Sequence, residues 1–166
     1  MRKTIQAAAF GAAMLAGAGA QGREMVPFEA GVRPGTIVVR TSERRLYLAL
    51  GDGRAIRYAV AVGQPGKQWF GWSVVDGKHV NPAWSPPDVV RRDKPWLPDV
   101  IPGGSPRNPM GVRALTLSGG EYAIHGTNVP TSIGRFASYG CIRMHNRDIV
   151  DLFERVGVGT PVVVVR

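Results

Sequence analysis

Glycine and proline interrupt this chain so often that only short stretches of regular structure fit between them. The 166 residues include 22 Gly and 13 Pro, and the runs between them are rich in β-branched and aromatic residues. This pattern is typical of short strands joined by turns. We therefore expect a mainly β fold, and the length suits one domain.

Two Asp-Gly pairs mark candidate hairpins. Asp52-Gly53 and Asp76-Gly77 can each supply the positive φ angles of a tight turn. We expect each pair to join two neighbouring antiparallel strands. The predicted strands cover residues 36–40, 45–50, 55–62, 72–75, 78–80, 113–117, 121–125 and 162–165, the last closing the sheet.

One segment near the C-terminus has the periodicity of a helix. Its apolar residues recur at i, i+3, i+4 and i+7, on one face of an amphipathic helix. Asn146 stands where an N-cap is expected, and Gly157 where the helix should end. The apolar stripe consists of Ile149, Leu152, Phe153 and Val156.

Residues 81–110 carry eight prolines, which leaves little room for sheet ladders. A flexible linker between two domains is one interpretation. The presence of Trp84 and Trp96 favours another, because long loops inside a small domain are usually lids or binding loops. We expect a packed loop that borders the active cleft.

The N-terminus has the pattern of a secretory signal peptide. Arg2 and Lys3 precede an uncharged run that closes on Ala18-Gly19-Ala20. A transmembrane anchor is the alternative, but the run is short and only weakly apolar for a span. We expect a signal peptide at residues 1–20, export to the periplasm or cell envelope, and no stable membrane span after cleavage.

The formal net charge is +9, with Lys and Arg scattered along the sequence rather than gathered in a block. A basic surface attracts polyanions such as nucleic acid, anionic lipid or acidic wall polymers. Export argues against nucleic acid. The cell envelope is therefore the expected location of the partner.

Cys141 is the only cysteine of the chain. An exported protein with a single cysteine cannot use it in an internal disulfide, so a reactive role is favoured over a structural one. His125 ends a predicted strand sixteen residues earlier, so it could serve as base to a Cys141 nucleophile. Gly140 would let the backbone amides of Tyr139, Gly140 and Cys141 approach a substrate carbonyl as an oxyanion hole.

Other interpretations of these residues remain open at this point. Spacing alone fits a buried, inert thiol as well as a nucleophile. A metal site could draw on His79, His125, His145 and Cys141, but this spacing matches none of the usual zinc patterns, and we expect no metal. A papain-like peptidase would place its cysteine ahead of its histidine, the reverse of the order here.

Several motifs together resemble the catalytic domain of L,D-transpeptidases, the cysteine enzymes of bacterial peptidoglycan. The resemblance covers residues 36–166, and the combination of a histidine with Ser-x-Gly-Cys-x-Arg is specific. The matching stretches are residues 108–115, 124–127, 133–134, 138–144 and 159–162, with opening strands at 37–39 and 46–48.

The resemblance implies a β-sandwich of mixed sheets with one principal helix. It makes residues 21–35 a lead-in and residues 36–166 the catalytic domain. The thiolate of Cys141 would attack the third residue of a tetrapeptide stem, on the L-centre of a diamino acid, and expel the terminal D-alanine. His125 would act as general base and then general acid. The supporting or substrate-binding residues would be Gly126, Thr127, Ser138 and Arg143.

The same resemblance implies the partners. The acceptor would be the amine of a second stem, giving a 3→3 cross-link for cell-wall biogenesis and cell shape, or a lysine of an envelope lipoprotein. Carbapenem-type β-lactams are the expected inhibitors. No cofactor is needed.

Two positions depart from the family pattern. Tyr139 stands where the family usually has histidine, and the pH profile and donor preference are expected to respond to that change. The common Thr-Pro-x-Gly segment is not evident, and residues 66–72, Gly-Lys-Gln-Trp-Phe-Gly-Trp, occupy that region instead, so the family's substrate groove is not expected to carry over in detail.

Two alternatives accompany the transpeptidase. A carboxypeptidase or endopeptidase would use the same acyl-enzyme, with water in place of the amine. A non-catalytic wall-binding module is the other, favoured by the basic charge. The retention of Cys141 and His125 argues against that module.

Overall fold

The computed structural model describes residues 23–119 and 122–166. The predicted signal peptide at residues 1–20 lies outside these described residues, as do Glu121 and the first part of the lead-in. Within the described ranges, no helix has the length and apolar character needed to cross a membrane.

Short strands dominate the fold, as the glycine and proline pattern predicts. The helical elements are α1 (Asp88–Asp93), the 3-10 turn η1 (Pro130–Ser132) and the principal helix α2 (Asn146–Arg155). The strands are β1 (Glu24–Pro27), β2 (Ile37–Arg40), β3 (Arg45–Gly51), β4 (Arg54–Gly63), β5 (Gly71–Val80), β6 (Arg113–Leu117), β7 (Ala123–His125), β8 (Phe136–Ser138), β9 (Ile142–Met144) and β10 (Pro161–Val165).

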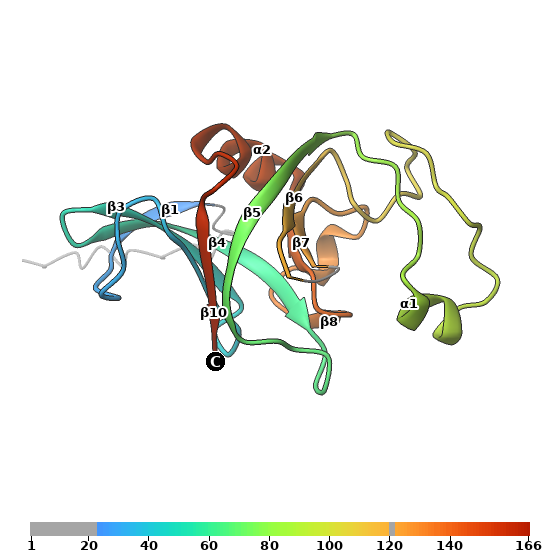
Figure 1. Cartoon of the computed structure of the whole chain (residues 1–166), viewed down its shortest axis with the longest axis horizontal. Helices are drawn as coiled ribbons and strands as arrows, with labels where there is room; N and C mark the ends of the chain where they lie inside the picture. Colours follow the sequence, from blue (N-terminus) through green and yellow to red (C-terminus); the bar gives the residue numbers. More distant parts are fainter. Residues whose placement is uncertain (1–22, 120–121) are drawn as a thin grey trace, which may run out of the picture.

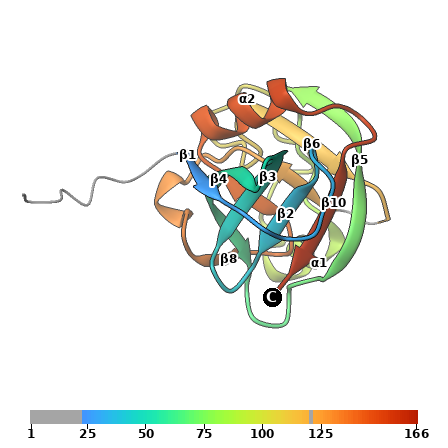
Figure 2. The ribbon, with the colours of Figure 1, turned by 90° about the vertical axis from the view of Figure 1, so that its left-hand side faces the viewer.

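The strands form one sheet that closes on itself. Its order is β1-β4-β3-β2-β10-β5-β6-β7-β9, and β9 pairs back with β4. Figure 2 shows the part of this order from β1 to β5. The expected sandwich is thereby corrected to a single closed sheet, because the long strand β4 pairs with both β3 and β9. The mainly β class and the mixture of parallel and antiparallel pairs are confirmed. The last strand lies between β2 and β5.

The main core fills the space between the closed sheet and α2. The predicted stripe of α2 is confirmed, since Ile149, Leu152, Phe153 and Val156 are all buried in it. A buried aliphatic or aromatic side chain contributes about 2 kcal/mol. The stripe therefore anchors α2 firmly over the strands that carry the site (Figure 1).

The two predicted hairpins have opposite outcomes. The turn at Asp52-Gly53 is confirmed, with φ angles of 53° and 64° between the antiparallel strands β3 and β4. At Asp76-Gly77 the chain does not turn, and β5 continues through both residues. Thr116 of the neighbouring strand β6 donates a hydrogen bond to Asp76 (2.5 Å), and the pair is absorbed as an irregularity in the β5–β6 register.

The proline-rich segment, residues 81–110, stands beside the closed sheet at the right of Figure 1. Apart from α1 and an isolated bridge between Trp84 and Ile101, it has no regular structure. Asn108 holds it together, because its buried amide donates to the carbonyls of Pro82, Ile101 and Pro102 (2.8, 3.2 and 3.0 Å). The expectation of a packed loop is confirmed around Asn108, but Trp96, one of the two tryptophans on which it rested, is 75% exposed.

The described part of the lead-in also packs on the sheet. β1 pairs with β4 in antiparallel fashion, and Phe28 stacks on Tyr47 of β3 at 4.5 Å between ring centroids. This contact covers a second, smaller apolar cluster on the outer face of the sheet.

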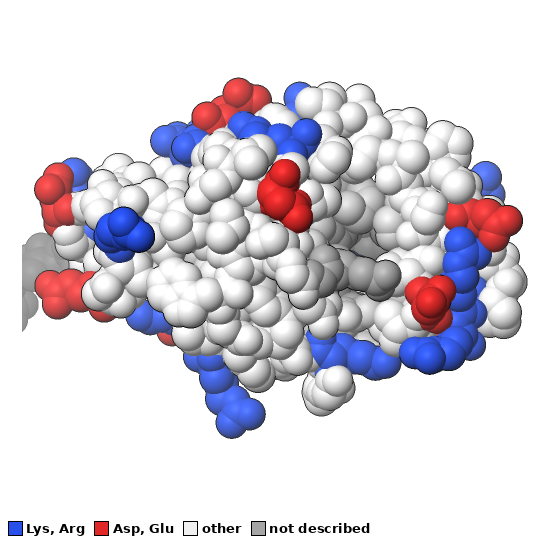
Figure 3. All heavy atoms as spheres, viewed as in Figure 1, with Lys and Arg blue, Asp and Glu red and all other residues white. Residues whose placement is uncertain are grey.

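Charged side chains of both signs lie on the face that Figure 3 shows. On the face in Figure 3, Lys and Arg occur in several separate places with acidic groups among them.

Candidate active site

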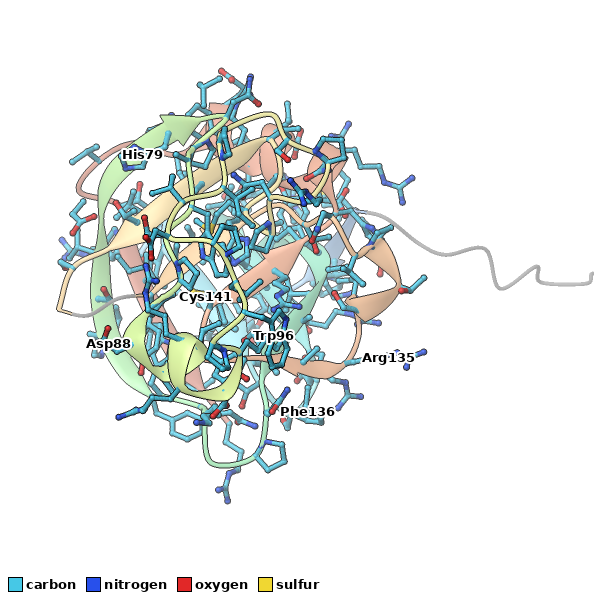
Figure 4. All side chains as sticks on the ribbon, turned by 90° about the vertical axis from the view of Figure 1, so that its right-hand side faces the viewer. His79, Asp88, Trp96, Arg135, Phe136 and Cys141 are labelled. Carbon is cyan, nitrogen blue, oxygen red and sulfur yellow. The ribbon has the colours of Figure 1, made fainter. Side chains whose placement is uncertain are left out.

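A cavity of about 450 Å³ opens between the proline-rich segment and the strands β7 and β9. Trp84, Val90 and Met110 of that segment line one side, so the prediction that the segment borders the cleft is confirmed. Cys141 and His125 line the same cavity. Figure 4 shows Cys141 near the middle of this face, with Asp88 and Trp96 of the segment around it.

The sheet brings the three central side chains to one side. His125 and Arg143 are register partners on the parallel strands β7 and β9. Cys141 stands two residues before Arg143, and side chains two apart on an extended chain point the same way. All three line the cavity, so residues sixteen positions apart in sequence border the same space.

His125 is buried and neutral. Its Nδ1 lies 2.7 Å from the carbonyl oxygen of Gly126, and a carbonyl only accepts, so Nδ1 carries the proton and Nε2 is left as an acceptor. Burial, assisted by the positive charge of Arg143, lowers the pKa of His125 to about 4. A neutral imidazole at physiological pH is the form that can take a proton from a thiol.

A clamp fixes the turn that follows His125. The side chain of Asn146 accepts from the Thr127 amide (3.0 Å) and donates to the Thr127 carbonyl (3.1 Å). Gly126 is required here, because a Cβ would overlap the Asn146 amide. The N-cap predicted at Asn146 is therefore wrong. The N-cap position is His145, and Asn146 is the first residue of α2. The Asn146 side chain bonds to Thr127 instead of capping the helix.

The loop before the nucleophile is held by the side chains of Ser138 and Trp69. Ser138 Oγ donates to the Cys141 carbonyl (2.6 Å) and accepts from the Gly140 amide (3.1 Å). The indole of Trp69 donates to the Gly140 carbonyl (3.1 Å). Because N–H and C=O of a trans peptide point in opposite directions, the indole bond also sets the direction of the Cys141 amide.

An aromatic pair packs against this loop. Trp69 stacks on Tyr122 with 5.0 Å between centroids and 7° between planes. Gly140 has a φ of 127°, and a Cβ there would overlap the Tyr122 ring. The position therefore demands glycine on two grounds. In this structure the Gly140 amide is engaged by Ser138, and the oxyanion role expected of the amides of Tyr139, Gly140 and Cys141 remains a prediction.

Tyr139, the unusual residue of the motif, lines the same cavity as Cys141. Its hydroxyl donates to Asp93 at the end of α1 (2.9 Å), which raises the pKa of Tyr139. The ammonium of Lys67 lies 5.3 Å from the centre of its ring. Tyr139 thus ties the nucleophile loop to the proline-rich segment.

The other two histidines lie elsewhere. His79 is in β5, and His145 lines a separate hollow of about 700 Å³ near the start of α2. Over the described ranges, no three His, Cys, Asp or Glu side chains group as metal ligands would.

Several site residues were missed by sequence reasoning. Trp69, Tyr122 and Asp93 carry no motif of their own, and their roles depend on contacts between distant segments. The unusual residues 66–72 were the only available signal, since they pointed to an altered groove.

Burial of the neutral His125 makes stability depend on pH. Its folded pKa of about 4 lies below the ordinary 6.5, so between these values the unfolded chain binds more protons. We expect the free energy of unfolding to fall by on the order of 2–3 kcal/mol as pH drops through this window. In His125→Gln this part of the pH dependence should vanish. Urea denaturation of both proteins between these pH values measures the difference, and parallel curves would contradict it.

The family model of the L,D-transpeptidase catalytic domain (YkuD) matches residues 34–164. Among curated proteins, the probable L,D-transpeptidase YbiS of Escherichia coli K12 is 42% identical over 134 residues, which are 76% of this chain and 43% of the relative. The probable L,D-transpeptidase ErfK/SrfK of the same strain is 40% identical over 143 residues, 81% of this chain and 44% of the relative. The chain thus spans less than half the length of these relatives.

Solved structures share the fold. An Enterococcus faecium L,D-transpeptidase mutant superposes with a TM-score of 0.64 at 17% identity, covering 81% of this chain and 50% of that one. The L,D-transpeptidase LdtMt1, solved in complex with imipenem, gives a TM-score of 0.60 at 16% identity, with 78% and 58% covered.

Proposed function

The chain belongs to the L,D-transpeptidase catalytic-domain family, and on that premise we propose that it transfers acyl groups between peptidoglycan stem peptides through Cys141. The observation that carries the proposal is the shared cavity, which is lined both by the neutral His125 at the end of β7 and by Cys141 immediately before β9.

The reaction has two halves. The Cys141 thiol gives its proton to Nε2 of His125, and the sulfur attacks the carbonyl of the diamino acid at its L-centre. The C–N bond to the terminal D-alanine breaks, and D-alanine leaves with the proton from His125. An amine then attacks the thioester, transfers its proton to His125 and releases the thiolate. Water in the second half would give hydrolysis.

The surrounding residues have assisting roles in this proposal. Amides next to the nucleophile stabilise the oxyanion, an effect of about 3–4 kcal/mol for one well-aimed donor. Ser138 holds the nucleophile loop, and Gly126 with Thr127 orients His125. No metal or organic cofactor takes part.

The acceptor and inhibitors belong to the same proposal. A second stem would give a 3→3 cross-link, and a lysine of an envelope lipoprotein would give attachment of that protein to the wall. Carbapenems are proposed to acylate Cys141, supported by the imipenem complex of LdtMt1. Export to the periplasm or envelope rests on the N-terminal sequence pattern.

Product analysis tests the proposal. We expect incubation with a tetrapeptide donor and an acceptor stem to release D-alanine and yield a 3→3 linked dimer by mass spectrometry. Omission of the acceptor should leave mainly the acyl-enzyme. Free tripeptide formed equally fast with and without acceptor would identify a hydrolase. Stem binding without release of D-alanine would identify a wall-binding module.

A further inference from the structure

A four-residue turn places a lysine on the rim of the cavity. In residues 64–67 the Lys67 amide donates to the Gln64 carbonyl (2.8 Å), with Pro65 and Gly66 at the centre and a φ of 77° at Gly66. This is the geometry of a type II turn. The Gln64 amide in turn donates to the Ser138 carbonyl (2.9 Å), so the turn is fixed to the strand that leads to the nucleophile.

The lysine side chain is also directed. Its ammonium lies 5.3 Å from the centre of the Tyr139 ring, and the hydroxyl of that ring is held by Asp93. Such a cation–π contact orients an ammonium without satisfying its N–H donors. Lys67 lines the same cavity as Cys141. The N–H groups of its ammonium can therefore donate to a ligand bound at the rim of this cavity.

The cavity is positively charged. Its described lining contains Lys67 and Arg143 and neither Asp nor Glu. Across residues 23–119 and 122–166, no ion pair involves either cation. Burial lowers the pKa of Arg143, which reflects the cost of holding this charge away from water. A cavity whose charged lining groups are cations attracts an anionic ligand.

We infer that Lys67 binds a carboxylate of the donor stem and makes the enzyme select donors that carry it; this inference rests on the proposed function. A tetrapeptide stem ends in one carboxylate, and its diamino acid can carry a second beside the side-chain amine. Both present the same chemistry to an ammonium. The lysine belongs to residues 66–72, the stretch that departs from the family pattern.

The test compares donors that differ only in charge. Steady-state kcat/KM is measured for a donor with both carboxylates, for the same donor with the side-chain carboxylate as carboxamide, and for the donor with the terminal carboxylate as carboxamide. The proteins are the wild type, Lys67→Met, Lys67→Arg and Lys94→Met. Lys94 loses the same charge but lies outside the cavity lining, which makes it the matched control.

We expect Lys67→Met to lose roughly 10- to 100-fold in kcat/KM for the full donor, the range for a hydrogen bond to a charged group. One carboxamide donor should abolish this difference between Lys67→Met and the wild type, and that donor identifies the carboxylate. Lys67→Arg should recover part of the loss, whereas Lys94→Met should keep the wild-type preference.

Two outcomes overturn the inference. A wild-type preference retained by Lys67→Met, or an equal loss on all three donors, would mean that Lys67 binds no donor carboxylate. Neither outcome touches the proposed function, because the wild type would still turn over the full donor. Absence of turnover by the wild type would instead refute the proposed function itself.

Discussion

We expect Cys141→Ala to abolish acyl transfer and to leave the fold intact. The substitution removes the sulfur that forms the acyl-enzyme and only a small volume at a partly exposed site. Cys141→Ser should be inactive as well, because a hydroxyl is a far weaker nucleophile than a thiolate at neutral pH. Donor-dependent release of D-alanine measures the effect, with circular dichroism and thermal unfolding as checks on folding. Cross-linking retained by Cys141→Ala would refute the mechanism.

His125→Ala should lower turnover by about 10²- to 10⁴-fold at pH 7, the range typical of a general base. The loss should shrink at high pH, where the thiol ionises without assistance. His125→Gln, which preserves more of the buried volume, distinguishes lost chemistry from lost packing. Rates from pH 6 to about 10 provide the measurement.

His145→Ala is the matched control for this substitution. His145 lies at the start of α2 and lines a different hollow, so its loss should leave the pH–rate profile close to that of the wild type. An unchanged rate for His125→Ala at pH 7 would contradict the role of His125 as the base.

Local sequence patterns were sufficient to predict much of the fold. The stripe of α2 and the hairpin at Asp52-Gly53 depend on neighbours in sequence, and both were predicted correctly. Asp76-Gly77 has the same local signal, but Gly77 pairs with Thr116 of β6 and β5 stays extended through both residues. Whether an Asp-Gly pair turns is therefore decided here by a tertiary contact.

The active site was likewise predicted only in part. Its motif predicted Cys141 and His125, and the structure brings both to one cavity. The role of Asn146 was predicted wrongly. An asparagine at a helix start can act as an N-cap or bond to a neighbouring turn, and here its side chain bonds to Thr127. The support from Trp69 arises only once β4 has closed the sheet against β9, a contact that no local pattern encodes.

Intact-mass analysis after incubation with a carbapenem tests the central claim most directly. The strained carbonyl of the drug resembles the acyl donor, so an activated thiol beside an oxyanion site should open the ring and retain the whole molecule. We expect a single adduct that maps to Cys141 in the wild type and is absent from Cys141→Ala. Folded, reduced wild-type protein that gains no mass, or an adduct that persists in Cys141→Ala, would contradict a Cys141 acyl-enzyme.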